Sequence, residues 1–476
     1  MDPQLFWWSY EYVGDLAETV ALVWPARPGA NREPELAEVI EGLRTAGRTE
    51  VQTLIEGWLD AMRERRVRGA LLKLVTGGLR VGLSARLAKR AAAEMGGVEP
   101  AEIEELWHAL HPPYEDLFAW LEGRAQRPSS ENPGRFRPAM LAQALDEATD
   151  FGKLDSADYA AEWKWDGIRV QAVNEAGVRR LYTRTGDDIS KSFPDVLGAL
   201  SQEGVIDGEL LVLCDGKAAS FADLQQRLNR KTVDAKLTTA FPAAIRAYDL
   251  LAEGREDTRT LSFAERRKRL EAFVARQHSP RIDLSPTQPF ETWAELARLR
   301  ADPPAGDAQL AEGLMLKRWD SIYEAGRPKG PWFKWKRDPF LVDAVLMYAQ
   351  RGHGKRSSFY SDYTFGVWDD GKLTPVGKAY FGFTDEELKA LDKFVRDHTV
   401  ERFGPVRAVR ADQDFGLVLE VAFEGLQRSS RHRSGVAMRF PRISRIRWDK
   451  PAAEADDLAR LESMLAAMEG GGDRSG

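Results

Sequence analysis

The sequence has little cysteine and no long apolar run. Its one cysteine, Cys214, excludes an internal disulfide framework and a cysteine-based zinc site. No stretch reaches the roughly 20 apolar residues that cross a membrane, and the first residues lack the basic and apolar regions of a signal peptide. The six histidines are scattered and suggest no metal cluster. We therefore expect a cytoplasmic protein without membrane association, in which Cys214 is a small buried residue.

The chain is too long for a single hydrophobic core. Its 476 residues predict roughly two to four domains. The content of 43% hydrophobic and 30% charged residues is ordinary for a soluble globular protein. The formal net charge of −6 averages over segments of opposite sign, so the local segments carry more information than the total.

Residues 1–125 are predicted to be almost entirely helical. Apolar residues recur there at helical spacing in three windows, 36–43, 51–59 and 103–110. A cationic, glycine-broken segment from Arg63 to Arg90 lies between the second and third windows. Glycines beside basic residues let backbone amides approach phosphates closely. A solvated basic helix face is nevertheless the more frequent explanation of a charge run that stands alone.

The remaining chain divides by composition. Residues 126–137 contain the proline, serine and glycine of a linker, and in 138–338 short strand-like runs alternate with turns and a few helices. Asp338-Pro339 breaks this pattern and is a plausible hinge. Over 339–470, short, evenly punctuated strands and one helix at Asp385–Arg396 suit a small barrel such as an OB-fold. We expect a last helix at Ala453–Met468 and a disordered tail over 471–476.

The octapeptide Glu162–Arg169 holds a lysine between two tryptophans. Asp166-Gly167 stands between two extended runs, which predicts a hairpin. Lys164 would then lie at a strand end or in a tight turn, where partial desolvation and nearby cations favour the free amine that attacks as a nucleophile. A surface lysine in a hairpin turn explains the octapeptide equally well. We interpret Trp163 and Trp165 as packing residues, and Asp166 as either a cap of its own turn or a metal ligand.

Acidic and basic residues follow on later strands. Glu209 is expected in an acidic turn between two apolar runs, and Glu312 at the start of a short strand. Several cations accompany them: Arg169, Arg184, Lys317, Lys334 and Lys336. Carboxylates beside clustered lysines suggest a metal that bridges to phosphates, and Tyr248 or Trp163 can stack on a base. A lysine that attacks a nucleoside triphosphate would form a lysyl–nucleotide adduct and release pyrophosphate.

Six segments of the chain resemble, in the same order, the motifs of the covalent nucleotidyltransferases, which comprise ATP-dependent DNA ligases, RNA ligases and mRNA capping enzymes. Lys164–Arg169 resembles motif I, Lys-x-Asp-Gly-x-Arg. The later segments resemble motif III at Asp207–Glu209, motif IIIa at Tyr248–Leu251, motif IV at Glu312–Lys317, motif V at Trp332–Lys336 and motif VI at Met438–Lys450. Six such matches in order are very hard to obtain by chance.

The N-terminal region narrows the resemblance to DNA ligases. The segment 71–83, with Thr-Gly-Gly-Leu-Arg-Val-Gly at 76–82, resembles the helical DNA-binding domain of eukaryotic and archaeal replicative ligases and of some bacterial relatives. This favours DNA contact for the basic segment and implicates Arg80, Arg86 and Lys89. The single cysteine disfavours the NAD-dependent ligases, which carry a four-cysteine zinc site.

The resemblance also implies a role for each matching position. Lys164 would take AMP, with Glu162 beside the adenine and Tyr248 stacked on it. Arg169 and Arg184 would hold the ribose and phosphate. Glu209 and Glu312 would serve ribose recognition and metal binding. The α-phosphate would be contacted by Lys317, Lys334 and Lys336. In the last motif, Arg439 and Arg442, with Asp449 and Lys450, would orient the pyrophosphate leaving group, for which the barrel must swing in.

The implied protein is an ATP-dependent DNA ligase that seals nicks in duplex DNA with 5′-phosphate and 3′-hydroxyl ends. Its cofactors would be ATP and Mg²⁺, with Mn²⁺ able to substitute. We expect a monomer that associates with the nucleoid when it is on DNA. The implied fold joins an all-α N-terminal domain, an α+β nucleotidyltransferase domain of antiparallel sheets and a C-terminal OB-fold barrel. An RNA ligase or guanylyltransferase, and a catalytically dead DNA-binding protein, are the alternatives that a nucleotide-labelling assay separates.

Overall fold

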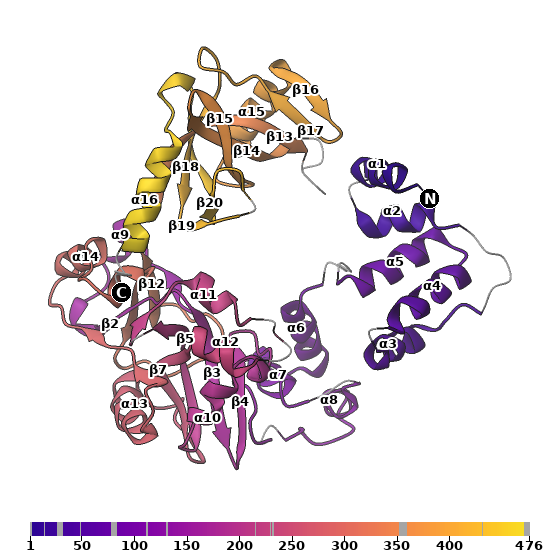
Figure 1. Ribbon diagram of the computed structural model, residues 1–476. Helices are drawn as coiled ribbons and strands as arrows, with labels where there is room; N and C mark the ends of the chain where they lie inside the picture. The colour runs from indigo at the N-terminus through magenta and orange to yellow at the C-terminus, as the bar shows by residue number, and fades with distance from the viewer. Residues whose placement is uncertain are drawn as a thin grey trace. The chain divides into compact units, whose positions relative to one another are not determined.

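The computed structural model (Figure 1) describes most of the chain: residues 2–13, 15–25, 32–47, 49–77, 83–110, 113–129, 132–214, 216–228, 230, 233–351, 359–430 and 432–470. These residues form two compact units. One comprises 1–85, 346–364 and 383–411, and the other 86–345, 365–382 and 412–476. In the described part of the chain, every helix is too short or too polar to cross a membrane.

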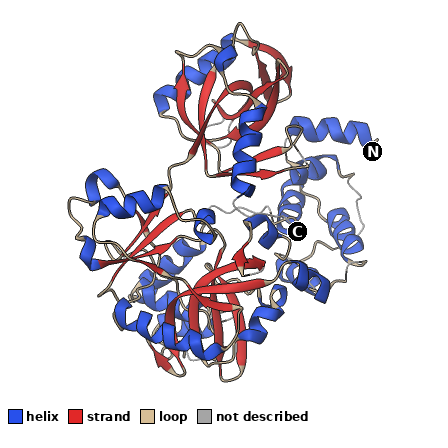
Figure 2. Cartoon of the chain, turned by 60° about the vertical axis from the view of Figure 1, so that its left-hand side comes forward, coloured by secondary structure: helices blue, strands red, loops and turns tan. Residues whose placement is uncertain are grey.

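The N-terminal region is helical, as predicted, and its helices are among those drawn in blue in Figure 2. Its helices are α1 (Pro3–Val13), α2 (Leu16–Val23), α3 (Leu36–Thr45), α4 (Val51–Ala61), α5 (Arg65–Val75), α6 (Ala85–Gly96), α7 (Pro100–Trp107) and α8 (Glu115–Leu121). They build two separate cores. Val39, Leu59 and Leu71 centre the first, whereas Ile103 and Leu117 belong to the second, formed by α6 to α8.

Two sheets form the central region. The first has the order β1-β12-β11-β2-β10, with β1 (Gln143–Ala144), β12 (Trp332–Lys336), β11 (Gly313–Arg318), β2 (Tyr159–Trp163) and β10 (Thr287–Gln288). The second has the order β4-β3-β5-β7-β8, with β6 beside β5 and β9 beside β7. Its strands are β4 (Val178–Thr183), β3 (Ile168–Glu175), β5 (Gly204–Cys214), β7 (Ala243–Glu253), β8 (Glu256–Asp257), β6 (Lys217–Ala218) and β9 (Ile282–Leu284).

Alternate side chains of the second sheet bury into different cores. Ile206 and Leu210 of β5 pack with Leu270 of a covering helix, whereas Val205 packs with Trp332 of the first sheet. The two sheets therefore share a core. The helices of this region are α9 (Glu147–Asp150), α10 (Pro194–Ala199), α11 (Phe221–Gln225), α12 (Ala235–Ala240), α13 (Phe263–Gln277) and α14 (Trp293–Ala301), with short 3-10 turns at Ser156–Asp158, Ser190–Ser192 and Asp307–Leu310.

The C-terminal region is rich in short antiparallel strands. Its sheet has the order β15-β14-β13-β17-β16, with β18 beside β13 and β21 beside β18, and β19 pairs with β20. The strands are β13 (Phe340–Arg351), β14 (Tyr360–Asp369), β15 (Lys372–Ala379), β16 (Thr399–Phe403), β17 (Val406–Val409), β18 (Val418–Phe423), β19 (Gly425–Arg428), β20 (Val436–Arg439) and β21 (Arg442–Arg447). Helix α15 (Asp385–Asp397) occupies the predicted place, because Thr384 and Glu387 form a capping box at its start.

Four predictions of local structure are wrong. β2 and β3 lie in different sheets, so Glu162–Arg169 is not a hairpin. β5 continues through Asp207-Gly208-Glu209, where an acidic turn was expected. Cys214 ends β5 and is exposed rather than buried. The last helix, α16 (Leu458–Gly470), begins later than expected because a 3-10 turn occupies Ala452–Glu454.

Candidate active site

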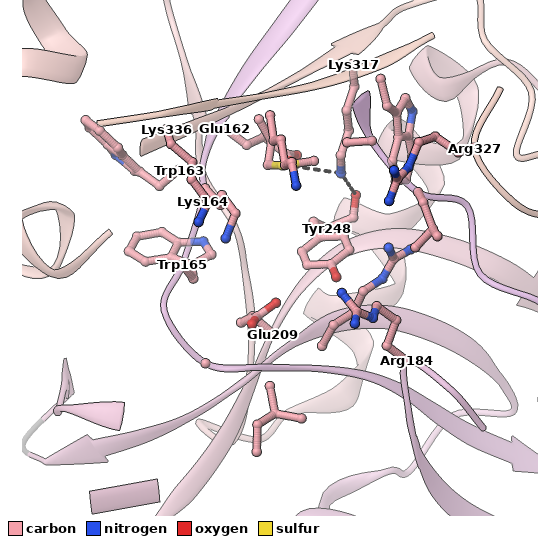
Figure 3. A pocket seen from close by; sticks show the side chains of 18 of the residues that line it. Glu162, Trp163, Lys164, Trp165, Arg184, Glu209, Tyr248, Lys317, Arg327 and Lys336 are labelled. Carbon is pink, nitrogen blue, oxygen red and sulfur yellow. Dashed lines mark hydrogen bonds and ion pairs between the residues drawn. The ribbon is translucent and has the colours of Figure 1, made fainter. Parts of the chain in front are cut away.

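A cavity of about 520 Å³ lies where the two central sheets meet. Strands of both sheets contribute side chains to its wall, and nearly all the predicted nucleotide contacts of the central region lie there together: Glu162, Lys164, Arg169, Arg184, Glu209, Tyr248, Lys317, Lys334 and Lys336. In Figure 3, Lys164 and Lys336 are on one side of the cavity, and Arg184 and Arg327 are on the other. Residues from 162 to 336 thus converge on one space.

Lys164 lies at a strand end, directly after β2. Its backbone N–H donates to the Gly313 carbonyl at 2.8 Å, and its own carbonyl accepts from the Glu312 N–H at 2.7 Å. These bonds extend the β2–β11 ladder by one step and bring the Lys164 ammonium to the Glu312 carboxylate, with which it pairs. Residues 164–167 then cross to the second sheet. Gly167 is required at this crossing because a Cβ atom would lie 2.4 Å from the Leu210 carbonyl oxygen.

The flanking tryptophans are buried, as predicted for packing residues. Trp163 is 4% exposed and Trp165 is 6% exposed. They also line the cavity, which the packing interpretation did not include. Trp165 donates from Nε1 to Ser285 at 2.9 Å, and the Arg246 guanidinium lies 4.3 Å from its ring centre. Trp165 is therefore held firmly beside the lysine.

Strand β5 supplies two acidic side chains, of which Asp207 is buried and Glu209 is half-buried. The Asp207 carboxylate accepts from Arg169 at 3.0 and 2.6 Å and from the Tyr323 hydroxyl at 2.6 Å, so Asp207 can lie inside a strand. Glu209 faces the cavity. Burial raises the pKa of Glu209 to about 8, while the charges of Lys164 and Arg169 act in the opposite direction. A cation bound beside Glu209 would favour its ionised form.

Lys317 forms a buried ion pair with Glu162. Its ammonium lies 2.8 Å from the Glu162 carboxylate, donates to the Tyr248 carbonyl at 3.1 Å and lies 4.4 Å from the centre of the Tyr248 ring. Arg267 donates to the other Glu162 oxygen at 2.8 Å. Figure 3 shows Lys317, Glu162 and Tyr248 grouped on one side of the cavity. Glu162 therefore has cationic partners at both oxygens.

Lys334 and Lys336 point to the same side of β12, as their alternation with aromatic residues predicts, and both line the cavity. Burial lowers the pKa of Lys334, and so do the like charges of Lys336, Lys164, Arg327 and Arg184. Cations gathered in this way repel one another until an anion neutralises them. The cavity is therefore suited to a polyphosphate.

The C-terminal region contributes contacts to the same site. Arg439 of β20 pairs with Asp166, from Nη2 at 3.0 Å, so Asp166 has a partner that neither turn capping nor metal binding predicted. Burial raises the pKa of Asp166 despite this pairing. Arg442 lies 3.7 Å from Glu424, and Glu424 also accepts from Lys336 at 2.8 Å. Arg439 and Arg442 thus each approach the site through one carboxylate, Asp166 and Glu424 respectively.

Asp449 and Lys450 make their described contacts elsewhere. Asp449 accepts from Arg447 at 3.0 Å, which lowers the pKa of Asp449 to about 2. Lys450 donates to Asp343 at 2.7 Å. Among the contacts described for these two residues, none joins them to the cavity. Their predicted role with pyrophosphate therefore gains no support from the geometry.

The three predicted DNA contacts, Arg80, Arg86 and Lys89, differ in their exposure and in whether the structure describes them. Arg86 is exposed on α6. Lys89 is 8% exposed and pairs with Glu104 at 2.6 Å. It is therefore corrected from a surface phosphate contact to a buried link between α6 and α7. Arg80 lies outside the described residues.

Some residues of the site were not predicted from the sequence. Thr183, Thr185 and Arg327 line the cavity, and none belongs to a segment that resembles a motif. Arg327 stands in the glycine- and proline-rich stretch 325–331, which is the composition of a loop and could have drawn attention to it. Glu424 gave no signal, because its partners Lys336 and Arg442 lie far from it in sequence.

The donor set for a metal is small. Within the described ranges, no three His, Cys, Asp or Glu residues cluster as ligands. Glu209 fits a cation best, because it is a half-buried carboxylate in the wall of a cavity suited to phosphates. One or two carboxylates together with substrate phosphates are how proteins usually bind Mg²⁺. Glu312, the other predicted ligand, is paired with Lys164.

Two family models match the chain. The one described as ATP dependent DNA ligase domain covers residues 139–336, and the one described as ATP dependent DNA ligase C terminal region covers residues 356–450. A "Probable DNA ligase" of Koribacter versatilis is 34% identical over 421 residues, which are 84% of this chain and 72% of the relative. A "Probable DNA ligase" of Opitutus terrae is also 34% identical, and the match covers 87% of this chain but only 47% of that longer relative.

A solved structure supports the fold. The structure named "Pmar-Lig_Pre." is similar to this chain with a TM-score of 0.59 at 17% identity, over 90% of this chain and 88% of its own. At this identity, the similarity concerns the arrangement of helices and sheets only.

Proposed function

This chain belongs to the family of ATP-dependent DNA ligases, which form phosphodiester bonds, and we propose that it seals nicks with 5′-phosphate and 3′-hydroxyl ends in duplex DNA through a lysyl-AMP at Lys164. The observation that carries the proposal is the position of Lys164, whose ammonium meets Glu312 beside a cavity walled by cations. A nucleophilic lysine needs an acceptor for its proton and stabilisation of the charge that develops on phosphate.

Three steps account for the atoms. The Lys164 amine attacks the α-phosphorus of ATP. The N–P bond forms, the bond to pyrophosphate breaks, and the ammonium proton has the Glu312 carboxylate as its acceptor. An oxygen of the DNA 5′-phosphate then attacks the AMP phosphorus and frees Lys164. Finally, the 3′-hydroxyl attacks the 5′-phosphorus, the phosphodiester bond forms, and AMP leaves with the electrons of the broken anhydride bond.

The cavity offers a place for each part of ATP. Lys334, Lys336, Arg184 and Arg327 would hold the phosphates, because their charges lie around the same space. Tyr248 would stack on the adenine and Glu162 would lie beside it. Arg169, which Asp207 holds in place, would contact the ribose. Lys317 would act on the α-phosphate only after loosening its ion pair with Glu162.

The family implies ATP and a divalent metal, and we propose Mg²⁺, with Mn²⁺ able to replace it. Glu209 would hold the ion, joined by Glu312 once its lysine partner has reacted. When bound, the ion would neutralise phosphate charge. Arg439 and Arg442 would orient the pyrophosphate. We also propose that the C-terminal strands form an OB-fold barrel.

DNA would be bound mainly through its phosphates. The exposed Arg86 on α6 and Arg80 are the proposed contacts in the N-terminal region. Phosphate contacts give weak sequence preference and strong dependence on salt. We propose that the enzyme acts as a monomer.

The test is nucleotide labelling. The wild-type protein is incubated with Mg²⁺ and α-labelled ATP or GTP, beside Lys164→Ala. Label from ATP on the wild type alone is expected, stable in alkali and lost in acid because the proposed linkage is a phosphoramidate N–P bond, followed by sealing of a nicked DNA duplex. If the wild-type protein takes no label, the proposed chemistry is wrong. Label from GTP only would indicate a capping activity, and sealing of nicked RNA only would indicate an RNA ligase.

A further inference from the structure

The wall of the cavity includes a turn that the helical region contacts. Residues Thr183–Asp187 form a turn that starts at the last residue of β4, and Thr183, Arg184 and Thr185 line the cavity. Arg184 is exposed at this wall, and its charge is among those that act on Lys334. The placement of this turn therefore decides whether Arg184 is aimed at a bound nucleotide.

Bonds within the turn determine its shape. The Thr183 N–H donates to the Asp187 carbonyl at 2.9 Å, and the Gly186 N–H donates to the Thr183 carbonyl at 3.0 Å. The Thr183 hydroxyl also donates to the Asp187 carboxylate at 3.1 Å. These bonds are local and determine the shape of the turn. Thr183 also pairs with Val170 of β3, so strand pairing fastens the first residue of the turn.

His108, the residue directly after α7, contacts the turn from outside. Gly186 has φ +88°, and a Cβ atom there would lie 2.5 Å from His108 Cε1 and 2.7 Å from Nδ1. The histidine ring thus lies directly against the backbone of the turn. The ring also contacts Phe136 edge-to-face, with centroids 4.6 Å apart, and Phe136 is 3% exposed. Phe136 Cδ1 would itself lie 3.1 Å from the Gly186 Cβ atom, so the His108 ring and the buried Phe136 ring lie together against the turn.

Helix α7 is itself anchored to the central region. Glu105, one helical turn before His108, pairs with Arg135 at 2.9 Å and with Arg259 at 2.5 Å. Two arginines on one carboxylate leave α7 little freedom to move away from the turn. Burial, and secondarily the charge of Lys89, lower the pKa of His108 to about 4. Its ring is neutral at physiological pH and adds no charge to the cavity.

We propose that His108 is a positioning residue for nucleotide binding: its ring braces the Thr183–Asp187 turn from behind, so that Arg184 and Thr185 face the cavity. The proposal rests on the proposed function, because it assumes that this cavity holds ATP. It gives the helical region a role in the nucleotide step in addition to its proposed role on DNA. Because the contact is steric, an aromatic ring of similar size should replace the histidine.

The experiment compares His108→Ala with His108→Phe, and uses His278→Ala, at the end of α13, as the matched control. The rate of self-adenylation is measured against ATP concentration. We expect His108→Ala to raise the half-saturating ATP concentration about 3- to 10-fold with less change in the maximal rate, and His108→Phe and His278→Ala to resemble the wild type. Equal behaviour of His108→Ala and the wild type, or equal losses in His108→Ala and His108→Phe, would overturn the proposal.

A double-mutant cycle tests the contact itself. Gly186→Ala places a methyl group against the His108 ring and also strains a left-handed backbone position. Removal of the ring relieves only the first effect, so Gly186→Ala with His108→Ala should bind ATP better than Gly186→Ala alone. Strictly additive effects would contradict the contact.

A readout without chemistry separates the two proposals. ATP binding raises Tm by mass action, and this rise is measured for each variant. If the wild-type protein takes no label, the lysyl-AMP proposal is wrong. A smaller ATP-induced rise in Tm for His108→Ala than for His278→Ala would still support the bracing role of His108. Equal rises in all variants, with a wild type that is labelled, would contradict only the bracing role.

Discussion

In the proposed reaction, the Lys164 side chain serves only some of the steps. It would be required where AMP is taken from ATP and passed to DNA, but no bond to it would form or break when the 3′-hydroxyl attacks. Arginine preserves the charge beside Glu312, yet it stays protonated and is no nucleophile. Lys164→Arg should therefore abolish self-adenylation and retain sealing of a nick that already carries 5′-AMP.

The measurement is sealing of pre-adenylated nicked duplex without ATP, with Lys164→Ala in parallel. Lys164→Arg should outperform Lys164→Ala because the cationic charge at the cavity is kept. If Lys164→Arg seals neither the ordinary nick with ATP nor the pre-adenylated nick, although its Tm equals that of the wild type, the division into steps is wrong.

His108 offers a prediction about pH. Folding lowers its pKa from an ordinary value near 6.5 to about 4, chiefly through burial. Between these values the unfolded chain binds a proton that the folded protein does not, so the contribution of His108 to stability is complete above pH 6.5 and is lost as pH falls toward 4. Lys89, Glu104, Glu105 and Asp187 also act on this ring.

His108→Phe removes this titration. Its Tm should equal that of the wild type at pH 7.5 and exceed it at pH 5. His278→Phe, at an exposed position, is the control for replacing a histidine with phenylalanine. A pH-independent difference in Tm between His108→Phe and the wild type would mean that folding does not lower the pKa of His108.

At the scale of elements, the close contact of β5 with β7 determines where Glu209 lies. The register of the two strands shifts between Asp207 and Gly208. A Cβ atom on Gly208 would lie 2.6 Å from Ile245 Cγ2 and 2.9 Å from the Arg246 carbonyl oxygen. Gly208→Ala should therefore push the strands apart, lower the free energy of unfolding by about 1–3 kcal/mol, and slow self-adenylation by displacing Glu209.

Gly198 is the matched control, because it lies in α10 and its Cβ atom would meet nothing within 4 Å. Gly198→Ala should be neutral or stabilise by up to about 1 kcal/mol. Denaturant unfolding and the labelling rate are measured for both. Equal stability of the two variants would show that β5 and β7 can relax apart without cost.

At the scale of the whole molecule, binding to DNA should be separable from nucleotide chemistry. Arg86→Gln removes an exposed charge on α6, so it should weaken binding to nicked duplex and reduce the salt slope by about 1, with self-adenylation unchanged. Lys268→Gln, at an exposed position of α13, is the control and should leave the slope as it is. Equal losses of sealing and self-adenylation in Arg86→Gln would mean that α6 is structural.

Lys89→Gln should behave differently from Arg86→Gln. Lys89 pairs with Glu104 in a partly buried setting, and its loss leaves the carboxylate without its partner. The expected result is a lower Tm with a salt slope like that of the wild type. A reduced slope with an unchanged Tm would restore Lys89 as a DNA contact.

The sequence by itself determined which segments matter and the local structure of many of them. Helical spacing located three of the N-terminal helices, α3, α4 and α7, and the alternation of aromatic residues and lysines in Trp332–Lys336 predicted both β12 and the shared side of Lys334 and Lys336. The order of the motif-like segments identified Lys164 and most of the cavity wall. These are local or linear properties, which periodicity and residue spacing express directly.

The tertiary structure alone decided which segments meet. Lys164 pairs with Glu312, 148 residues away, and β2 joins β11 rather than β3, because strand pairing follows burial of both faces and not proximity in sequence. Asp207 lies inside a strand because Arg169 and Tyr323 satisfy its charge, and Lys89 is buried because Glu104 accompanies it. A buried charge depends on a partner from elsewhere in the chain, and local sequence does not reveal that partner.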